Sequence, residues 1–355
     1  MKRRVTMKDI AEQLNVSVNA VSLALNDKKG VGKETRNRIL NKAEKMGYFL
    51  EKAKYKKSLS NKNICILIPT QYYRNSDFYA KVLLGVEEEA KKNGYEILIN
   101  FTDKLSGIPD CVKESRVCGI IVIGRISDEY LMALKKHRLP IVVVDHSSMA
   151  EPVDCILTNN KLGSYRITRL LISNGYRKIG FFGDLNYSMS IKERFFGYQE
   201  AIHNLIPMNG YRNVSRYALE YSILGNVEQF VIKQNVLKIM DQLEQLEQLP
   251  QAFVCSNDEA AVQMIHALQQ MGYRVPEDIA VVGFDNTPLS TIISPQLTTV
   301  NVYKEFMGRA AVQRLIWRIS HLNEPFENIV LNVEIVERES NLFLRKQHSQ
   351  PLPYM

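Results

Sequence analysis

Short, unbroken apolar runs recur along the chain from residue 63 onward, and they limit its fold more than any other feature. Segments with helical periodicity, such as Phe78–Asn93 and Glu259–Met271, lie between them. Ile- and Val-rich runs without polar alternation indicate strands covered on both faces, which is typical of parallel sheets with crossover helices. The runs are Ile64–Pro69, Tyr95–Phe101, Gly119–Gly124, Pro140–Asp145, Lys178–Gly183, Ala252–Ser256 and Ile279–Phe284.

This alternation of strands and helices appears in residues 63–158 and again in residues 159–301. We therefore predict an α/β core with two parallel sheets and a junction near Thr158-Asn159. A chain of 355 residues is long enough for such a core and one further small domain.

The net positive charge of the chain comes from its first 62 residues. They contain 16 Lys and Arg against 6 Asp and Glu, a net charge of +10, whereas the remaining 293 residues contain 30 against 32. Such a block is either a solvated face or a polyanion-binding element, and neutralising phosphates requires clustered Lys and Arg. The hydrophobic pattern inside the block decides between these two interpretations.

That pattern predicts three short helices. Thr6 and Asp9 fit a capping box at the start of the first helix. Asn15 follows at a position where a tight turn needs a positive φ, which Asn tolerates. Ser17 is a suitable N-cap for the second helix, and a third helix is expected from about residue 33 to 46. The side chains expected on the outer face of the second helix are Val18, Asn19, Ser22 and Asn26.

Two short helices joined by a tight turn, the second polar on its outer face, form a helix-turn-helix. In that motif the second helix lies in the major groove of DNA, and its N-terminal side chains meet base edges. A three-helix protein-interaction bundle is the alternative interpretation. The local charge of +10 favours DNA.

The N-terminal residues also form a distinctive string with fixed spacing. It consists of Thr6-Met7-Lys8-Asp9-Ile10-Ala11, Val16-Ser17, Ala20-Val21-Ser22, Leu25-Asn26, Thr35-Arg36 and Gly47-Tyr48. In this string the chain resembles the LacI/GalR family of bacterial transcription regulators. The resemblance implies that Val18 and Asn19 determine which operator sequence is bound. Asn can bond adenine in a bidentate way, whereas Val offers only apolar contact to a thymine methyl. The other positions that it places at phosphates or bases are Thr6, Ser17, Ser22, Asn26 and Arg36.

Two departures from the family pattern concern DNA contact. Leu23 stands where the family usually has Arg. The hinge segment lacks the family's usual motif, and Leu59 is its only late Leu, the residue type that the family inserts into the minor groove. A plain basic linker, attracted to the phosphate backbone by its lysines, is the alternative for this segment.

The core carries further matching strings. They are Gly175-Tyr176-Arg177-Lys178-Ile179-Gly180-Phe181, Ser256-Asn257-Asp258, Val281-Val282-Gly283-Phe284-Asp285 and Pro295-Gln296-Leu297-Thr298-Thr299-Val300. They resemble the family's effector core, whose fold is shared with periplasmic sugar-binding proteins. The resemblance implies crossings between two subdomains near residues 158, 301 and 327, with a small ligand in the cleft between them.

The resulting division has five parts. It comprises a helix-turn-helix DNA-binding domain at 1–48, a basic hinge at 49–62, a core N-terminal subdomain at 63–158 and 302–326, a core C-terminal subdomain at 159–301 and 327–345, and a tail at 346–355.

Polar residues at strand ends are the candidates for effector contact. Asp145, Asn257 and Asp285 each lie at or just past the end of an apolar run, and Arg194 lies in the first turns of a helix. A planar Arg beside carboxylates and an amide suits a sugar, whose hydroxyls both donate and accept hydrogen bonds. By resemblance, the ligand-contacting positions are Phe78, Tyr79, Asp145, Arg194, Asn257 and Asp285. Each also has a purely structural explanation, because a strand-end Asp can cap the next helix and an aromatic can pack in the core.

Other classes of protein fit the sequence less well. No apolar run approaches the ~18 residues of a membrane span, and charged residues follow the N-terminus where a signal peptide is apolar, so we expect a cytoplasmic protein. The scattered cysteines include no C-x-x-C pair, which predicts reduced thiols. The histidines lack metal-binding spacing and no nucleophile motif appears, so we expect no metal, no cofactor and no enzymatic activity.

These features together predict a transcription regulator, in this family most often a repressor, that is controlled by a sugar-like small molecule. We expect a homodimer on a double-stranded DNA operator, because the tail lacks a leucine heptad for further assembly. One alternative is a regulator of the same family that responds to a protein partner. Another is a solute-binding protein without a DNA role, which leaves the basic module unexplained. The effector, the operator sequence and the direction of the response are open at this point.

Overall fold

The structure is a computed structural model that describes residues 5–25, 28–46, 48, 61–70, 77–103, 107–206 and 214–341. Its N-terminal head contains helices α1 (Met7–Leu14), α2 (Val18–Leu25) and α3 (Lys33–Lys45). The backbone N–H of Asp9 donates to Thr6 Oγ1 (3.2 Å) and that of Thr6 donates to Asp9 Oδ2 (2.6 Å), so the predicted capping box is present. Asn15 ends α1 with a φ of 52°. Ile10, Val21 and Ile39, one from each helix, are fully buried together.

The N-terminal subdomain of the core is built on a six-stranded sheet with the order β10-β5-β4-β3-β1-β2, in which neighbouring strands are parallel. Its strands are β1 (Asn63–Pro69), β2 (Glu96–Thr102), β3 (Gly119–Ile123), β4 (Ile141–Val144), β5 (Asp154–Thr158) and β10 (Asn328–Leu331). Successive side chains of a strand point to opposite faces. Ile64 and Ile66 therefore pack in the core cluster that contains Val82 of α6 (Asp77–Lys92) and Met307 of α16 (Lys304–Ser320).

The opposite face of this sheet is covered by α7 (Asp110–Lys113) and α8 (Asp128–Lys135), where Leu67 packs with Cys111 and Leu131. Because helices cover both faces, the first strand has no polar alternation. Burial on both faces is thus the physical reason for the apolar runs of the inner strands, whereas the edge strand β2 is apolar although Ile99 and Phe101 are exposed (41% and 47%).

The C-terminal subdomain contains a three-stranded parallel sheet of β6 (Ile179–Phe182), β7 (Ala252–Cys255) and β8 (Ala280–Val282). An antiparallel pair, β9 (Thr299–Asn301) and β11 (Glu334–Val336), continues beside β8. Adjacent residues of β6 serve the two faces. Phe181 packs with α9 (Asn160–Ser173), α10 (Met189–Leu205) and α11 (Val214–Tyr221), and Phe182 packs with α12 (Val227–Ile232), α13 (Val236–Glu244) and α14 (Asp258–Gln270). The short α15 (Leu289–Ile292) follows β8.

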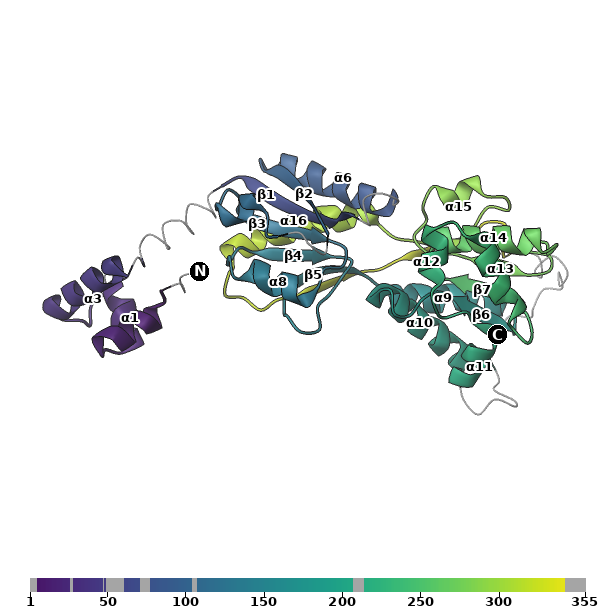
Figure 1. Cartoon of the computed structure of the whole chain (residues 1–355), viewed down its shortest axis with the longest axis horizontal. Helices are drawn as coiled ribbons and strands as arrows, with labels where there is room; N and C mark the ends of the chain where they lie inside the picture. The colour runs from purple at the N-terminus through teal and green to yellow at the C-terminus, as the bar shows by residue number, and fades with distance from the viewer. Residues whose placement is uncertain are drawn as a thin grey trace, which may run out of the picture.

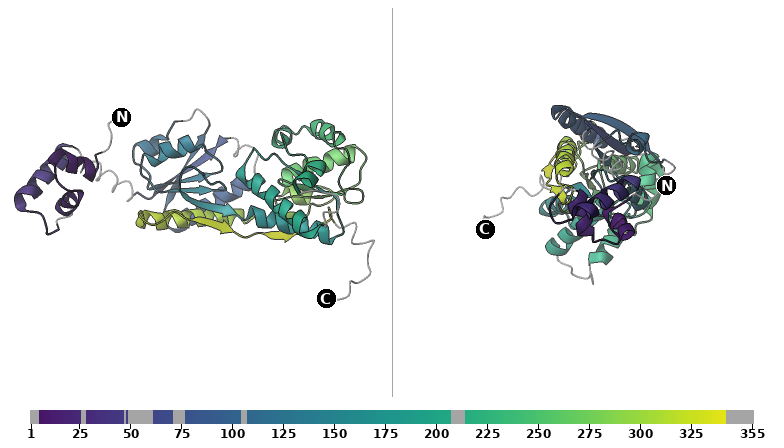
Figure 2. Two further views of the ribbon diagram at one scale, coloured as in Figure 1. Left: turned by 90° about the horizontal axis from the view of Figure 1, so that it is seen from below. Right: turned by 90° about the vertical axis from the view of Figure 1, so that its left-hand side faces the viewer.

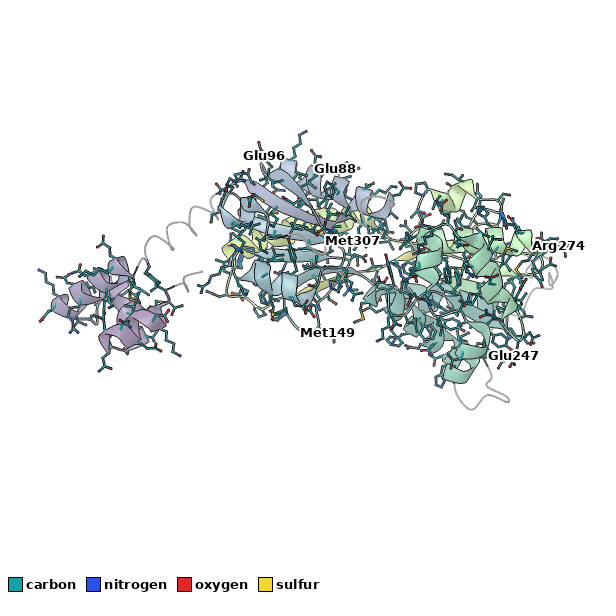
Figure 3. All side chains as sticks on the ribbon, in the orientation of Figure 1. Glu88, Glu96, Met149, Glu247, Arg274 and Met307 are labelled. Atoms are coloured by element: carbon teal, nitrogen blue, oxygen red, sulfur yellow. The ribbon has the colours of Figure 1, made fainter. Side chains whose placement is uncertain are left out.

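The chain passes between the subdomains after β5, after β9 and after β10, and Figure 1 shows these connections between the two halves of the core. Figure 2 shows the late segment with α16, β10 and β11, in yellow-green, running along one side of both halves. Figure 3 places Met307 within the N-terminal subdomain, where its sulfur accepts a hydrogen bond from Thr158 Oγ1 (3.5 Å) next to the first crossing.

The sequence-based prediction of an α/β core is confirmed, and each predicted apolar run overlaps a strand. The third crossing, expected near residue 327, is wrong by several residues. Asn328–Leu331 pairs with β5 in the N-terminal sheet, and the chain leaves that sheet only after Leu331. β10 is an edge strand that pairs with β5 alone, and its residues are exposed or half-buried, so it lacks the longer apolar run of a strand covered on both faces. In the described part of the chain, no helix is both long and apolar enough to span a bilayer.

Candidate DNA interface and effector cleft

The first turn of α2 presents the residues expected to read DNA. Ser17 Oγ accepts a hydrogen bond from the backbone N–H of Ala20 (3.1 Å) and so caps the helix. Val18 is 46% exposed and Asn19 is also exposed, whereas Val21 is buried in the head. Such a helix start, with two exposed side chains above a buried one, is suited to lie in a major groove.

Two of the other head candidates, Thr6 and Arg36, already serve the head's own structure. The hydroxyl of Thr6 donates to Asp9 Oδ2 (2.7 Å) within the capping box. The guanidinium of Arg36 donates to the Lys28 carbonyl in the loop between α2 and α3. Ser22 is half-buried on α2. Asn26 and Leu59 lie outside the described residues, and so does most of the hinge segment.

In the N-terminal subdomain, Tyr79 and Asp145 form one pair of effector candidates. The Tyr79 hydroxyl, in the first turn of α6, donates to Asp145 Oδ2 (2.9 Å) at the end of β4. Phe78 is buried in the core and meets the Tyr79 ring edge-on, with 5.0 Å between ring centroids. Burial raises the pKa of Asp145 to about 6, although the Arg194 charge and the Tyr79 hydroxyl oppose this rise.

In the C-terminal subdomain, the candidates are organised around Arg194, which α10 carries in a buried position. Its Nε donates to Asn160 Oδ1 (2.9 Å), its Nη1 to the Ser256 carbonyl (2.6 Å) and its Nη2 to Asp285 Oδ1 (3.0 Å). Its guanidinium also lies 3.8 Å from the centroid of the Phe284 ring. Burial raises the pKa of Asp285, against the lowering effect of the Arg194 charge.

Five of the six effector candidates thus fall into two contact groups, one of Phe78, Tyr79 and Asp145 and one of Arg194 and Asp285. The two groups are linked electrostatically, because the Arg194 charge lowers the pKa of Asp145. Asn257 is the exception. Its side-chain oxygen accepts a hydrogen bond from the backbone N–H of Ala260 (2.8 Å) as the N-cap of α14. Among the described residues no hydrogen bond links it to Arg194.

A cleft pocket of about 1250 Å³ opens between the two subdomains. None of the six candidates lines it. Its walls are the loops directly after the strands, with Arg125 and His146 on the N-terminal side and Asp184, Ser188 and Lys192 on the C-terminal side. The sequence did contain a signal for three of these residues, because Arg125, His146 and Asp184 each follow immediately after a predicted apolar run. Loops at the carboxyl ends of parallel strands are where open α/β folds bind ligands.

No group of three or more His, Cys, Asp and Glu side chains in the described ranges could hold a metal ion. The five cysteines, all within the described residues, form no disulfide bond and are buried.

Comparison with known proteins gives two matching families. The model described as bacterial regulatory proteins, lacI family, matches residues 6–49, and that of a periplasmic binding protein-like domain matches residues 168–341. The ribose operon repressor of Haemophilus influenzae is 32% identical over 346 residues, which cover 94% of this chain and 98% of that relative. The chain belongs to the LacI family of bacterial regulatory proteins. It is accordingly a DNA-binding transcriptional regulator and not an enzyme.

Further relatives and solved structures agree with this assignment. The HTH-type transcriptional repressor PurR of Mannheimia succiniciproducens is 30% identical over 342 residues, which cover 94% of this LacI-family chain and 98% of that relative. The CelR–cellobiose complex shares the fold with a TM-score of 0.64 at 22% identity, covering 95% of this chain and 100% of that one. The lac repressor dimer bound to operator has a TM-score of 0.65 at 21% identity, covering 96% and 100%.

Proposed function

We propose that this protein is a repressor whose operator binding is controlled by a sugar-like metabolite held between the two subdomains. One observation carries the proposal: the buried Arg194 donates to Asp285 Oδ1 (3.0 Å), and its charge also lowers the pKa of Asp145, a strand-end aspartate of the opposite subdomain. Carboxylates that accept and a guanidinium that donates match hydroxyl groups, which do both. We assign ligand contact to these three residues and to Tyr79.

The cleft pocket provides space beside the assigned residues: His146, which directly follows Asp145, lines it, although none of the assigned residues does. A volume of about 1250 Å³ can hold a small metabolite together with water, since ligand pockets usually measure ~300–1,000 Å³. Its walls come from both subdomains, so a ligand would favour one angle between them over others. β1 follows the hinge segment directly in sequence, and a change of this angle would alter the position of the head on DNA.

For the head, we propose that Val18 and Asn19 contact bases in the major groove. A homodimer would place two heads on the half-sites of a near-palindromic operator. The lac repressor structure is described as a dimer on its operator, which supports this arrangement. The expected operator can be selected from a random double-stranded DNA library with the full chain.

A thermal-shift panel tests the effector site. The full chain is melted with ribose, cellobiose and purine bases, compounds suggested by the relatives. A ligand at ~100 times its dissociation constant adds ~2.7 kcal/mol to stability. We expect Arg194→Ala to lose this stabilisation while still binding the selected DNA. The matched control is Arg274→Ala, because Arg274 is an exposed arginine paired with Asp278.

An Arg194→Ala protein that responds like the wild type would show that the ligand site is misassigned. A wild-type protein that binds DNA but is stabilised by no small molecule would instead favour the second candidate, a regulator controlled by a protein partner.

A further inference from the structure

We infer that Lys304 is a positioning residue of the effector site, which holds the turn of Asp285 and Asn286 in place and connects it to α16. The inference rests on the proposed function, because it assumes that the Arg194–Asp285 pair meets the effector. Lys304 itself is not proposed to touch the ligand.

Lys304 is buried with its ammonium group among backbone carbonyls. Only 5% of the residue is exposed, and its ammonium group donates to the carbonyls of Asp285, Val302 (3.2 Å) and Asn286 (3.3 Å). A lysine has three N–H donors, so these carbonyls can satisfy all of them. A buried charge is retained only where its hydrogen bonds are satisfied. The ammonium is therefore matched to this arrangement of carbonyls.

The backbone of the turn has positive φ angles at two successive residues. Asp285 has a φ of 107° and Asn286 a φ of 51°, and neither is a glycine. Residues in these sparsely populated regions persist where surrounding contacts fix them, and they gather at ligand sites. Side chains of Asn301 and Arg338 hold the Asn286 side chain (3.0 and 2.7 Å). Among the described contacts, Lys304 is the side chain that bonds the carbonyls of both turn residues.

Lys304 lies where the chain enters the N-terminal subdomain for the second time. It is the first residue of α16, directly after the crossing that follows β9, and α16 belongs to the other subdomain. The close packing of α16 on α6 is evident at Gly308, where an added Cβ would lie only 2.1 Å from the Val82 carbonyl oxygen. The Lys304 ammonium also lies 5.8 Å from the centroid of the Phe78 ring, next to Tyr79. Lys304 thus links the Asp285 turn on one side of the cleft to the helices that carry the other side.

These contacts give Lys304 a specific consequence. Asp285 uses its carbonyl for Lys304 and its carboxylate for Arg194, so a shift of the carboxylate on ligand binding would reach α16 through one residue. Without the ammonium, the turn would lose this restraint while the sheet beneath it kept its own hydrogen bonds.

The first test needs no ligand. Amide hydrogen exchange is followed in the full chain for wild type, Lys304→Met and the control Lys161→Met, since Lys161 forms an exposed ion pair with Glu200. We expect Lys304→Met to speed exchange at Asp285, Asn286 and Thr287 at least tenfold, with strand β7 unchanged. Unaltered exchange at the turn, or an equal acceleration throughout the C-terminal subdomain, overturns the inference.

The second test uses ribose and cellobiose, the two sugars of the panel above, as probes. If either stabilises the wild type, Lys304→Met should bind it at least tenfold more weakly. The affinity of Lys304→Gln, which keeps two N–H donors, should lie between those of the wild type and Lys304→Met. Wild-type affinity in Lys304→Met overturns the inference. If Lys304→Met does not fold, Lys304→Gln carries both tests. Failure of the wild type to bind either probe contradicts the proposed effector class, and hydrogen exchange then decides the role of Lys304.

Discussion

The head presents its candidate DNA contacts on the outside of one short helix, whereas the core holds its candidate effector contacts inside a net of hydrogen bonds. Val18 and Asn19 are exposed and adjacent in sequence. Arg194 is buried and bonded to Asn160, Ser256 and Asp285, which are 34, 62 and 91 residues away. Exposed contacts can be exchanged with little effect on the fold. Buried ones cannot, because each removed partner leaves another polar group unsatisfied.

The largest expected effect therefore lies in the core. Arg194→Met should destabilise the protein by about 3–5 kcal/mol, as expected when one partner of a buried ion pair is removed. Val18→Ala, an exposed change, should stay within about 0.5 kcal/mol. Urea denaturation followed by circular dichroism measures both. Equal stabilities of the two variants would show that the buried Arg194 contributes no more to the fold than the exposed Val18.

The next effect concerns sequence discrimination by the head. Asn19→Ala should lose about 1–3 kcal/mol of preference at a single operator position and leave affinity for other sequences nearly unchanged. Competition binding with operators altered one base pair at a time measures this preference. A uniform loss across all sequences would instead identify Asn19 as a backbone contact.

A smaller effect is expected from the capping box of α1. Thr6→Ala removes the oxygen that accepts the Asp9 N–H, which should destabilise the head by about 1 kcal/mol. Amide exchange in peptides from α1 measures the change, with Asn37→Ala on the exposed face of α3 as control. If Thr6→Ala and the control exchange alike, the cap contributes nothing to the head.

The last expected effect is a slope of stability against pH, not a change at one pH, and it comes from Asp145. Its pKa is raised to about 6 in the folded protein, so the folded state holds this proton more tightly than the unfolded state does. Stability should therefore fall as the pH rises from about 4 to about 6. The buried Glu228 and Asp258, with pKa values of about 7, add a similar background. Only the difference between wild type and Asp145→Asn isolates this group, and the variant should show the shallower fall. Identical pH profiles would contradict the raised pKa.

The same contrast explains what the sequence could predict. The start of α1 at Thr6, the turn at Asn15 and the cap at Ser17 depend on neighbours within a few residues, so local patterns predicted them correctly. The apolar runs predicted the strands, because burial on both faces leaves a local signature. Ligand-site geometry is different. The resemblance to a family suggested Arg194 and Asp285, but no local pattern shows that they meet.

Two features of the core could not be predicted from local patterns. Lys304 bonds the Asp285 carbonyl from 19 residues away, and its burial depends on how α16 packs. β10 is a short edge strand whose partner, β5, lies far back in the sequence. Asn257 shows the opposite problem, since its position after a strand fits both a ligand contact and a helix cap, and in the structure it caps α14.

The central claim is that the head and the cleft are coupled. Its most direct test measures operator affinity with and without the saturating ligand found in the panel, and ligand affinity with and without operator. The two ratios should be equal, because coupling is reciprocal, and typical values are about 5–150-fold. An operator affinity that is identical with and without saturating ligand would contradict the account.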